Sequence, residues 1–327
     1  MTRRLRIGVV GCGEVAVRFH LPAVARSQHA TLAAVVDSDA GRASEIARRF
    51  GARYALVDYR DLVGRVDAAV VATPNHLHAS VTGRLLQDGI DVMCEKPIAC
   101  TVNEAREMIA AARSGPGRLT VAHNCRFTPA MQEAKRLVDA GYLGALEEMS
   151  GAFGAPLGAW KARTDFRGRR ELAGGGVLID LGIHLIDLAC WMFGEPVAGL
   201  SYEGSDALGC GTETDADVAL EFGRGGRALV SCSATHTLDR VIRLRGSEGW
   251  IRAAAEGVEI EFFGRTARAC RIDGPQRLLV PAADSFTRQL DHFCDALLHD
   301  RPFLVTPEEA LRALEVVAGC YAHARAA

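Results

Sequence analysis

The residues best suited to acid–base chemistry lie in one apolar stretch, G-G-G-V-L-I-D-L-G-I-H-L-I-D at positions 174–187. This pattern predicts a helix, which would place Asp180 and His184 one turn apart on the same face, with Asp187 a further turn along. A histidine inside an apolar helix is by itself more often a packed core residue than a functional one. A carboxylate one turn away alters the proton affinity of the imidazole, so the pair predicts acid–base work on a substrate.

Lysine is scarce in this chain, which draws attention to the few positions that keep it. Of the 38 basic residues only three are lysines, at positions 96, 135 and 161. A site that needs a compact ammonium group with an adjustable pKa accepts lysine and not arginine. Lys96, within Glu95-Lys96-Pro97, is therefore a second candidate for chemistry.

The elements that must position these residues begin with a glycine-rich turn. An apolar run over 5–10 is followed by Gly11-Cys12-Gly13-Glu14-Val15-Ala16, a G-x-G-x-x-A motif, and then by a predicted helix over 15–26. The glycines permit a tight turn and let backbone N–H groups approach a pyrophosphate at the helix N-terminus. A second apolar strand over 31–36 leads to Asp37, 21 residues beyond Ala16, where a carboxylate would receive the adenosine ribose hydroxyls.

The charges around Asp37 bear on the choice of cofactor. Asp37-Ser38-Asp39 carries two negative charges and no adjacent arginine, so it would repel a 2′-phosphate. The sequence therefore predicts NAD as the cofactor, with NADP less favoured. The alternative interpretation, an aspartate that only caps the predicted helix over 40–50, leaves the preceding glycine turn unexplained.

Strands and helices continue to alternate up to residue 122. Strands are predicted over 67–72, 91–94 and 119–122, and helices over 77–88 and 101–113. This spacing is typical of βαβ units and a parallel sheet, in which ligands bind beyond the carboxyl ends of the strands. The segments at those ends are Thr73-Pro74-Asn75-His76-Leu77-His78 and Glu95-Lys96-Pro97.

The second half of the chain predicts a different architecture. After a helix over 129–140, strand-like runs fall at 143–153, 197–203, 216–222, 228–234, 240–246, 249–252 and 258–262, most of them separated by turn residues. They predict an open antiparallel sheet with one face on the helix that begins at Gly174. Helices over 284–299 and 307–325 close the chain, and the last helix may pack back on the first domain. The predicted domains are 1–122 and 123–327.

Four motifs taken together carry a resemblance that covers essentially the whole chain. They are G-x-G-x-x-A with Asp37, T-P-N-H-x-H at 73–78, E-K-P at 95–97 and the D-x-x-x-H helix, and they occur in the order typical of the Gfo/Idh/MocA oxidoreductases. The chain resembles that family. Ala16 replaces the third glycine of the fingerprint, a tolerated variant. The resemblance implies a Rossmann-type α/β parallel-sheet domain, followed by an α+β domain whose large, mostly antiparallel sheet forms a homodimer or homotetramer interface.

The resemblance also implies the roles of individual residues. Lys96, Asp180 and His184 would form the catalytic group and contact the substrate. Arg126 would contact substrate or cofactor, although a structural role for it is equally well supported. Trp160 and Arg163 lie in a polar loop that either selects the substrate or is an ordinary solvated loop. The expected cofactor contacts are Gly11, Gly13, Glu14, Val15, Ala16, Asp37, Ser38, Thr73, Pro74, Asn75, His78, Glu95 and Lys96.

Composition narrows the class of protein further. The chain is 49% hydrophobic and 24% charged, and its net charge of −2 provides no broad basic field for nucleic acid or an anionic membrane. No run of about eighteen uncharged apolar residues is present, so no membrane span and a cytoplasmic location are expected. The ten cysteines are widely scattered, without a C-x-x-C pair or zinc spacing, so we expect reduced thiols and no bound metal.

The predicted function is an NAD-dependent oxidoreductase that interconverts a secondary alcohol and a ketone on a sugar, aminosugar, other polyol or cyclitol. His184 would accept the hydroxyl proton, Lys96 would hold the oxygen, and Asp180 would orient His184 or bind a neighbouring hydroxyl. The sequence leaves open whether Lys96 or His184 takes the proton first. Two alternatives remain: a glycosidase that oxidises its sugar transiently with NAD, and a non-catalytic NAD-binding regulator, which would need none of these three residues.

Overall fold

The structure is a computed structural model that describes residues 3–156, 165–194, 197–255, 257–264 and 274–326. The chain forms two compact units. Unit 1 comprises Met1–His123, Trp160–Gly174 and Phe286–Leu314, and unit 2 comprises Asn124–Ala159, Gly175–Ser285 and Glu315–Ala327. Each unit therefore combines segments that are distant in the sequence.

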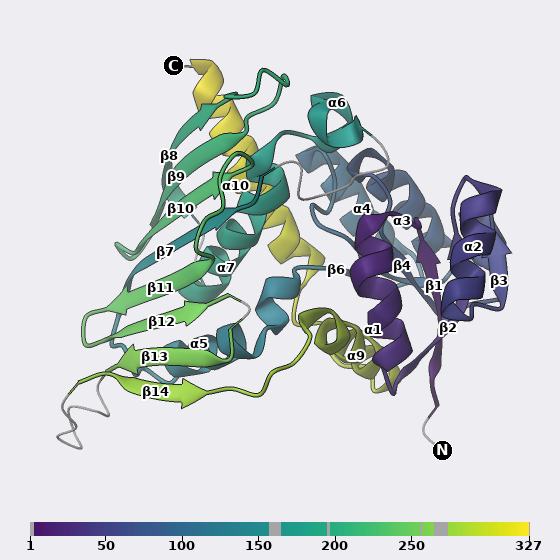
Figure 1. Ribbon diagram of the computed structural model, residues 1–327, viewed down its shortest axis with the longest axis horizontal. Coiled ribbons are helices and arrows are strands. Elements are labelled where there is room, and N and C mark those ends of the chain that lie inside the picture. Colours follow the sequence, from purple (N-terminus) through teal and green to yellow (C-terminus); the bar gives the residue numbers. More distant parts are fainter. Residues whose placement is uncertain (1–2, 157–164, 195–196, 256, 265–273, 327) are drawn as a thin grey trace. The chain divides into compact units, whose positions relative to one another are not determined.

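Unit 1 is built on a six-stranded parallel sheet with the order β3-β2-β1-β4-β5-β6 (Figure 1). Because the chain runs outward from β1 to β3 and then from β4 to β6, the carboxyl ends of β1 and β4 lie side by side where the direction reverses. This is the strand order of a doubly wound dinucleotide-binding fold. The strands are β1 (Leu5–Val10), β2 (Ala30–Val36), β3 (Tyr54–Leu56), β4 (Ala68–Val71), β5 (Asp91–Cys94) and β6 (Leu119–Val121).

Helices cover both faces of this sheet, because right-handed crossovers place the helices of the two halves on opposite sides. The side chains of Leu21, Ile46 and Phe293, from α1, α2 and α9, share one core cluster with β1 and β2. Helices α3 and α4 pack against each other, and α3 packs on β4 and β5. The helices are α1 (Leu21–Arg26), α2 (Ala40–Phe50), α3 (His78–Gln87), α4 (Val102–Ser114) and α9 (Ser285–Leu298).

Unit 2 is built on an eight-stranded sheet with the order β14-β13-β12-β11-β7-β10-β9-β8. All neighbouring pairs are antiparallel except β7 and β10, which run parallel at the centre. The strands are β7 (Leu146–Gly154), β8 (Val197–Ser205), β9 (Asp215–Phe222), β10 (Arg227–Ser233), β11 (Val241–Gly246), β12 (Trp250–Ala254), β13 (Glu259–Phe263) and β14 (Gln276–Leu279).

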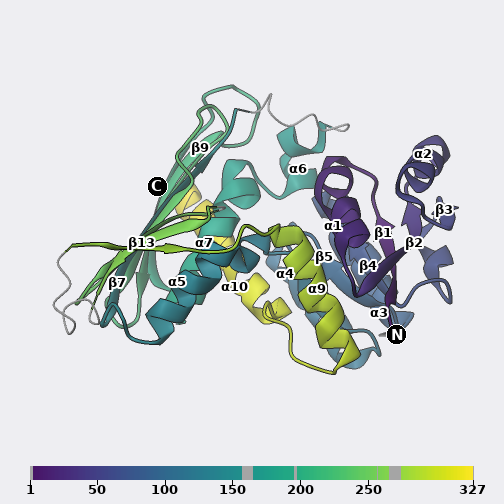
Figure 2. The same ribbon diagram turned by 60° about the horizontal axis from the view of Figure 1, so that its bottom comes forward.

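One face of this sheet is covered by helices, as Figures 1 and 2 show for α5 (Pro129–Asp139) and α7 (Ile183–Phe193). Helix α7 packs on β7 and β10, while α5 packs on β12 and β13. Alternation along the strands explains the arrangement, since Met149 and Phe153 of β7 are buried toward the helices and Glu148 points to the opposite side. The remaining helices are α6 (Arg170–Ala173) and α10 (Pro307–Ala326), whose residues are divided between the two units at Leu314.

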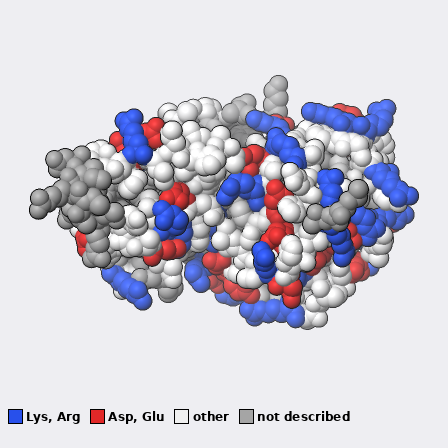
Figure 3. All heavy atoms as spheres, turned by 90° about the horizontal axis from the view of Figure 1, so that it is seen from below, with Lys and Arg blue, Asp and Glu red and all other residues white. Residues whose placement is uncertain are grey.

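The opposite face of the large sheet carries cross-strand charge pairs. Arg245 Nη2 lies 3.6 Å from Glu148 Oε2, and Arg227 Nε donates to the same oxygen over 2.6 Å. Exposed ion pairs of this kind contribute about 0–1 kcal/mol each to stability. On the molecular face drawn in Figure 3, basic and acidic side chains are likewise interspersed.

The predicted fold class is confirmed, and the bounds of most elements agree with the prediction within a few residues. The predicted mostly antiparallel sheet of unit 2 is confirmed, with one parallel pair, β7 and β10, at its centre. One local prediction is wrong: the helices expected after the glycine-rich turn and after Gly174 are not regular at their starts, because Ala16–His20 and Leu178–Gly182 are π-helical segments (η1 and η7). The short strands β3 and β14 lay outside the predicted set.

Burial explains two further features of composition. Arg170–Phe193 is long and apolar enough to cross a membrane by length and composition. Its most apolar 18-residue window has a mean hydropathy of 1.7, yet 72% of that window is buried inside the protein, as in a core helix. Of the described cysteines, Cys210 is exposed and Cys100 is half-buried. The buried ones are Cys12, Cys94, Cys125, Cys190, Cys232, Cys294 and Cys320.

Candidate functional site

The glycine-rich turn after β1 has the space that a dinucleotide requires. Gly11 has φ +95°, and a Cβ there would lie 2.5 Å from the Ala72 carbonyl oxygen, so only glycine is accommodated beside the end of β4. A Cβ on Gly13 would meet no atom within 4 Å. The second glycine therefore faces open space at the start of a helix, the arrangement that lets a pyrophosphate approach the backbone.

Asp37 is tied to this turn by hydrogen bonds. Its Oδ2 accepts from the backbone N–H of Cys12 and its Oδ1 from that of Asp39, both over 3.0 Å. Each carboxylate oxygen accepts more than one hydrogen bond, so the two ribose hydroxyls of an adenosine can still be received. The aspartate thus fixes the turn and presents a negative charge beside it.

Arg42 changes the expectation that no arginine is near Asp37. Its Nε donates to the Cys12 carbonyl oxygen over 3.1 Å, and its Nη1 lies 3.1 Å from Glu45 Oε2. Asp37 and Arg42 therefore bind the two sides of the same residue, although five positions separate them in the sequence. The sequence argument considered only the residues adjacent to Asp37. Arg42 lies in the first turn of α2, and the fold places its side chain against Cys12.

Lys96 follows Glu95, a buried residue just after β5 whose two carboxylate oxygens each have a hydrogen-bond partner. Glu95 Oε1 lies 2.6 Å from His20 Nε2, and Glu95 Oε2 accepts from the backbone N–H of Lys96 over 3.1 Å. Burial raises the pKa of the Glu95 carboxyl, but the hydrogen bond with His20 and the nearby positive charges outweigh this effect and hold the pKa below its usual value. The side chain of Lys96 is partly exposed.

His78 joins the two loops that follow β4 and β5. Its Nδ1 lies 2.8 Å from the Pro97 carbonyl oxygen and its Nε2 lies 3.0 Å from that of Thr73, and the ring is fully buried. Burial lowers the pKa of His78, although both carbonyl contacts oppose that shift. Both ring nitrogens are thus occupied by the protein itself, while the buried Thr73 Oγ1 makes no hydrogen bond with any described residue.

The helix predicted to carry the acid–base pair is present in unit 2, with a different local geometry. Asp180 lies in the π-helical segment η7, whereas His184 lies in the first turn of α7. The wider π turn contains an extra residue, so the two side chains are not related as they would be in a regular α-helix. Both are half-buried, and the His184 ring lies 6.3 Å from that of Phe153 between centroids.

Arg126 forms an ion pair inside unit 2. Its guanidinium donates from Nε and Nη2 to the two carboxylate oxygens of Asp187, over 2.8 and 2.7 Å, and both side chains are about 1% exposed. The guanidinium also lies 5.5 Å from the Trp191 ring centroid. This geometry supports the structural alternative for Arg126, since the fork holds α7 against η4 (Asn124–Phe127).

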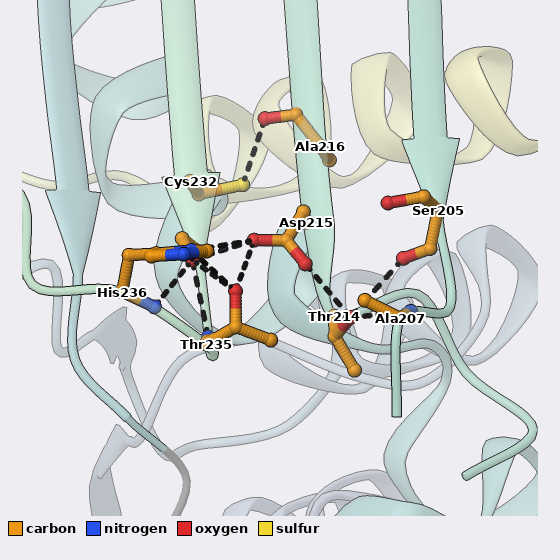
Figure 4. Close-up of polar contacts among 9 residues, drawn as sticks. Ser205, Ala207, Thr214, Asp215, Ala216, Cys232, Thr235 and His236 are labelled. Carbon is orange, nitrogen blue, oxygen red and sulfur yellow. Dashed lines mark hydrogen bonds and ion pairs between the residues drawn. The ribbon is translucent and has the colours of Figure 1, made fainter. Parts of the chain in front are cut away.

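A second polar cluster lies at the end of β10 and was not singled out by sequence reasoning (Figure 4). Asp215 Oδ1 accepts from the hydroxyls of Ser233 and Thr235 over 2.6 and 2.7 Å, and Thr235 Oγ1 lies 2.6 Å from His236 Nδ1. The Ser233 hydroxyl donates to the carboxylate and not to the imidazole, so the order of a nucleophilic triad is absent. The run Ser231-Cys232-Ser233-Ala234-Thr235-His236 was the available signal.

The structure divides the predicted site residues between the units. Those of unit 1 gather at the carboxyl edge of the parallel sheet, and Arg126, Asp180 and His184 belong to unit 2. Trp160 and Arg163 lie outside the described residues. The unit 1 set is Gly11, Gly13, Glu14, Val15, Ala16, Asp37, Ser38, Thr73, Pro74, Asn75, His78, Glu95 and Lys96; within it, the Asn75 amide donates to the Ala173 carbonyl over 2.8 Å.

Comparison with known families and proteins gives consistent matches over both units. Residues 5–123 match an oxidoreductase family with an NAD-binding Rossmann fold, GFO_IDH_MocA, and residues 131–252 match the GFO/IDH/MocA C-terminal domain. A dTDP-3,4-didehydro-2,6-dideoxy-alpha-D-glucose 3-reductase from Streptomyces violaceoruber is 30% identical over 311 residues, which cover 90% of this chain and 86% of the relative.

Solved structures of similar proteins extend over nearly the whole chain. An aldose-aldose oxidoreductase from Caulobacter crescentus, complexed with glycerol, has a TM-score of 0.88 at 27% identity, covering 99% of this chain and 98% of the other. A levoglucosan dehydrogenase in complex with NADH and levoglucosan has a TM-score of 0.90 at 21% identity, covering 99% and 98% of the two chains. At that lower identity the likeness describes the fold alone.

Proposed function

Because the chain belongs to the Gfo/Idh/MocA family of oxidoreductases, we propose that it interconverts a secondary alcohol and a ketone on a sugar, aminosugar, other polyol or cyclitol with NAD as its cofactor. The coarser statement follows from its relatives: this is an NAD(P)-dependent enzyme of sugar oxidoreduction. The observation that carries the proposal is the position of Lys96. It follows β5 at the same sheet edge as the glycine-rich turn.

The residues of unit 1 suit a dinucleotide. Gly13 leaves room for a pyrophosphate, Asp37 presents a carboxylate for ribose hydroxyls, and the buried Thr73 hydroxyl is able to donate a hydrogen bond to a ligand. When bound, the nicotinamide cofactor supplies the acceptor or donor of a hydride. Asp37 and Asp39 disfavour a 2′-phosphate, and Glu45 offsets the charge of Arg42, which supports NAD over NADP.

Three side chains would handle the substrate hydroxyl in this proposal. The Lys96 ammonium donates a hydrogen bond to the reacting oxygen and stabilises the negative charge that develops there. His184 accepts the hydroxyl proton as its general base, and Asp180 orients the imidazole or binds a neighbouring hydroxyl. We assign Arg126 to the support of the helix that carries His184, because its guanidinium is buried against Asp187.

We further propose a cytoplasmic enzyme that assembles as a homodimer or homotetramer through the uncovered face of the large sheet. The alternating charges of Arg227, Glu148 and Arg245 across neighbouring strands could pair with a second copy of the same face. Light scattering measures the mass directly. Arg245→Glu should lower that mass if the face is the interface, whereas Arg48→Glu, on the exposed side of α2, should leave it unchanged.

The test of function is a redox assay with a matched pair of variants. Purified protein is incubated with NAD or NADP and a panel of sugars, cyclitols and nucleotide-linked deoxysugars, and nicotinamide absorbance is followed. Lys96→Ala should lower kcat by about a hundredfold or more while the Kd for NAD stays within about threefold. Lys135→Ala, which replaces a partly buried lysine of α5 paired with Asp139, should retain full activity.

The same panel separates the alternatives. Lys96→Arg should also lose activity, because guanidinium is larger and does not release its proton readily. Near-normal turnover in that variant would show that only a positive charge is needed. Product formation without net change in nicotinamide absorbance would identify a glycosidase that oxidises its sugar transiently, and cofactor binding without turnover on any sugar would favour a regulator.

A further inference from the structure

Gly175 and Gly176 lie against a half-buried carboxylate and a tyrosine of the same unit, unit 2. Glu213 Oε1 accepts from the backbone N–H groups of Gly176 and Leu178 over 3.0 and 3.2 Å, and from the Tyr321 hydroxyl over 2.6 Å. The Glu213 carbonyl oxygen accepts from the N–H of Val177 over 2.9 Å. A single residue therefore receives three successive backbone donors at the start of the helix and a fourth donor from α10.

These contacts account for two of the glycines. A Cβ on Gly175 would lie 2.1 Å from the Tyr321 hydroxyl oxygen, and a Cβ on Gly176 would lie 2.1 Å from the Glu213 carbonyl oxygen. Such distances are far below van der Waals contact, so glycine is required at positions 175 and 176 by the approach of Tyr321 and Glu213. These two glycines thus have an explanation within the protein itself, without a phosphate ligand.

The contacts of Glu213 and Tyr321 with Gly175–Leu178, called the clamp below, lie next to Asp180, one of the proposed catalytic residues. The N–H of Asp180 donates to the Gly176 carbonyl oxygen over 3.2 Å, so Asp180 is one backbone hydrogen bond from a residue held by Glu213. A carboxylate at a helix N-terminus satisfies orphan N–H groups and interacts favourably with the helix dipole. The segment that follows is π-helical, and such segments are rare and frequently found at functional sites.

We propose that Glu213 and Tyr321 are positioning residues that hold the π-helical segment, and through it Asp180 and His184, in the geometry required for proton transfer. This inference rests on the proposed function, which gives Asp180 and His184 their roles. Glu213 acts through backbone N–H groups, and Tyr321 acts by fixing the carboxylate. Burial and the Glu213 charge raise the pKa of the Tyr321 phenol, so it remains a hydrogen-bond donor throughout the accessible pH range.

Kinetics of conservative variants provide the first test. Glu213→Gln keeps the shape but removes the charge, and Tyr321→Phe removes one hydroxyl. A misplacement of a catalytic group by about 1 Å costs up to about a hundredfold, so Glu213→Gln should lower kcat about tenfold or more and Tyr321→Phe by a few-fold. The Kd for NAD should not change, because the cofactor residues belong to unit 1. Tyr202→Phe, whose ring meets Tyr321 edge-on at 6.1 Å, is the matched control.

A double-mutant comparison distinguishes positioning from general destabilisation. If Glu213 acts through His184, Glu213→Gln should have less than about a twofold further effect on kcat in a His184→Asn background. Additive effects in that background would overturn the positioning role. So would an unchanged kcat in both single variants.

Amide hydrogen exchange tests the clamp without requiring turnover. Exchange of the Gly176, Leu178 and Asp180 amides in the intact protein should accelerate about tenfold or more in Glu213→Gln and less in Tyr321→Phe, with the amides of β1 unchanged. Unchanged exchange at those three amides would overturn the proposal. Should no sugar be oxidised by the unaltered protein, the proposed function fails on the activity panel, whereas the clamp is still judged by exchange.

Discussion

Glu95 is the residue on which several observations about unit 1 converge. It directly follows the buried strand β5, contacts His20 from the segment after the glycine-rich turn, and accepts a hydrogen bond from the backbone N–H of Lys96. The sequence predicted Glu95 as a cofactor contact because it begins the motif Glu95-Lys96-Pro97. Its contact with His20 could not be predicted, since 75 positions separate the two residues. Residue types and motifs thus identified the candidates, but their pairing depends on the tertiary fold.

The lowered pKa of Glu95 predicts a contribution to stability that depends on pH. A carboxyl with a folded pKa below its unfolded value of about 4.3 stabilises the fold above that value, and the contribution disappears as pH falls through the folded pKa. Glu95→Gln should lower the free energy of unfolding by about 1–3 kcal/mol at pH 7, with the difference from the unaltered protein shrinking below about pH 4.

Urea unfolding at several pH values, followed by circular dichroism, measures this effect. Glu104→Gln is the control, because glutamine can replace this partly exposed glutamate in the capping box with Thr101. A difference between Glu95→Gln and the unaltered protein that stays constant from pH 7 to pH 3 would contradict the prediction.

Asp37 and Arg42 make opposing predictions for the cofactor. Asp37→Ala should weaken NAD binding about tenfold or more, because charge-assisted hydrogen bonds to the ribose are lost, and it should narrow the gap to NADP. Arg42→Met should weaken NADP binding more than NAD binding. Fluorescence titration of both cofactors against both variants measures these changes, and equal affinities of the unaltered protein for NAD and NADP would refute the preference.

At the scale of elements, periodicity predicted most helices and strands, and the departures have physical causes. Strands β3 and β14 contain three and four residues, too few to show an alternating pattern. The parallel pairing of β7 with β10 depends on the connections between distant strands. The π-helical segments also escaped prediction, because a single π turn inside a longer helix leaves the apolar periodicity of the sequence nearly unchanged.

The buried Arg126–Asp187 pair predicts how strongly α7 is fixed. Asp187→Asn leaves a buried guanidinium without its counter-charge and should lower the free energy of unfolding by about 3–5 kcal/mol. The double variant Arg126→Met with Asp187→Leu should lose much less, since no charge is then buried. Denaturant titration gives the values.

An exposed pair in the same unit provides the comparison. Arg136→Met disrupts the pair with Glu133 on the surface of α5, which should cost about 1 kcal/mol or less. If Asp187→Asn were no more destabilising than this surface variant, the structural role assigned to Arg126 would be wrong.

At the scale of the whole molecule, two units with different sheets share one chain that passes between them more than once. The family match spans both, with one domain model over residues 5–123 and another over 131–252. The sequence predicted two domains from length and from the change in strand pattern. Phe286–Leu314 belongs to unit 1, whereas the sequence analysis considered such a return only for the last helix. The apolar periodicity of a helix shows that one face is buried, but it does not show which domain buries that face.

The burial of the cysteines gives each unit its own chemical reporter of opening. Burial raises the pKa of Cys94 and Cys294 in unit 1, and of Cys320 in unit 2, to about 12, so their thiolates are scarce at neutral pH and the folded protein shields them from alkylation. Exposed Cys210 should be alkylated first among the described cysteines. Mass spectrometry of timed alkylation would then read the opening rate of each unit separately, and equal rates at Cys210 and Cys94 would show that the native packing is not maintained in solution.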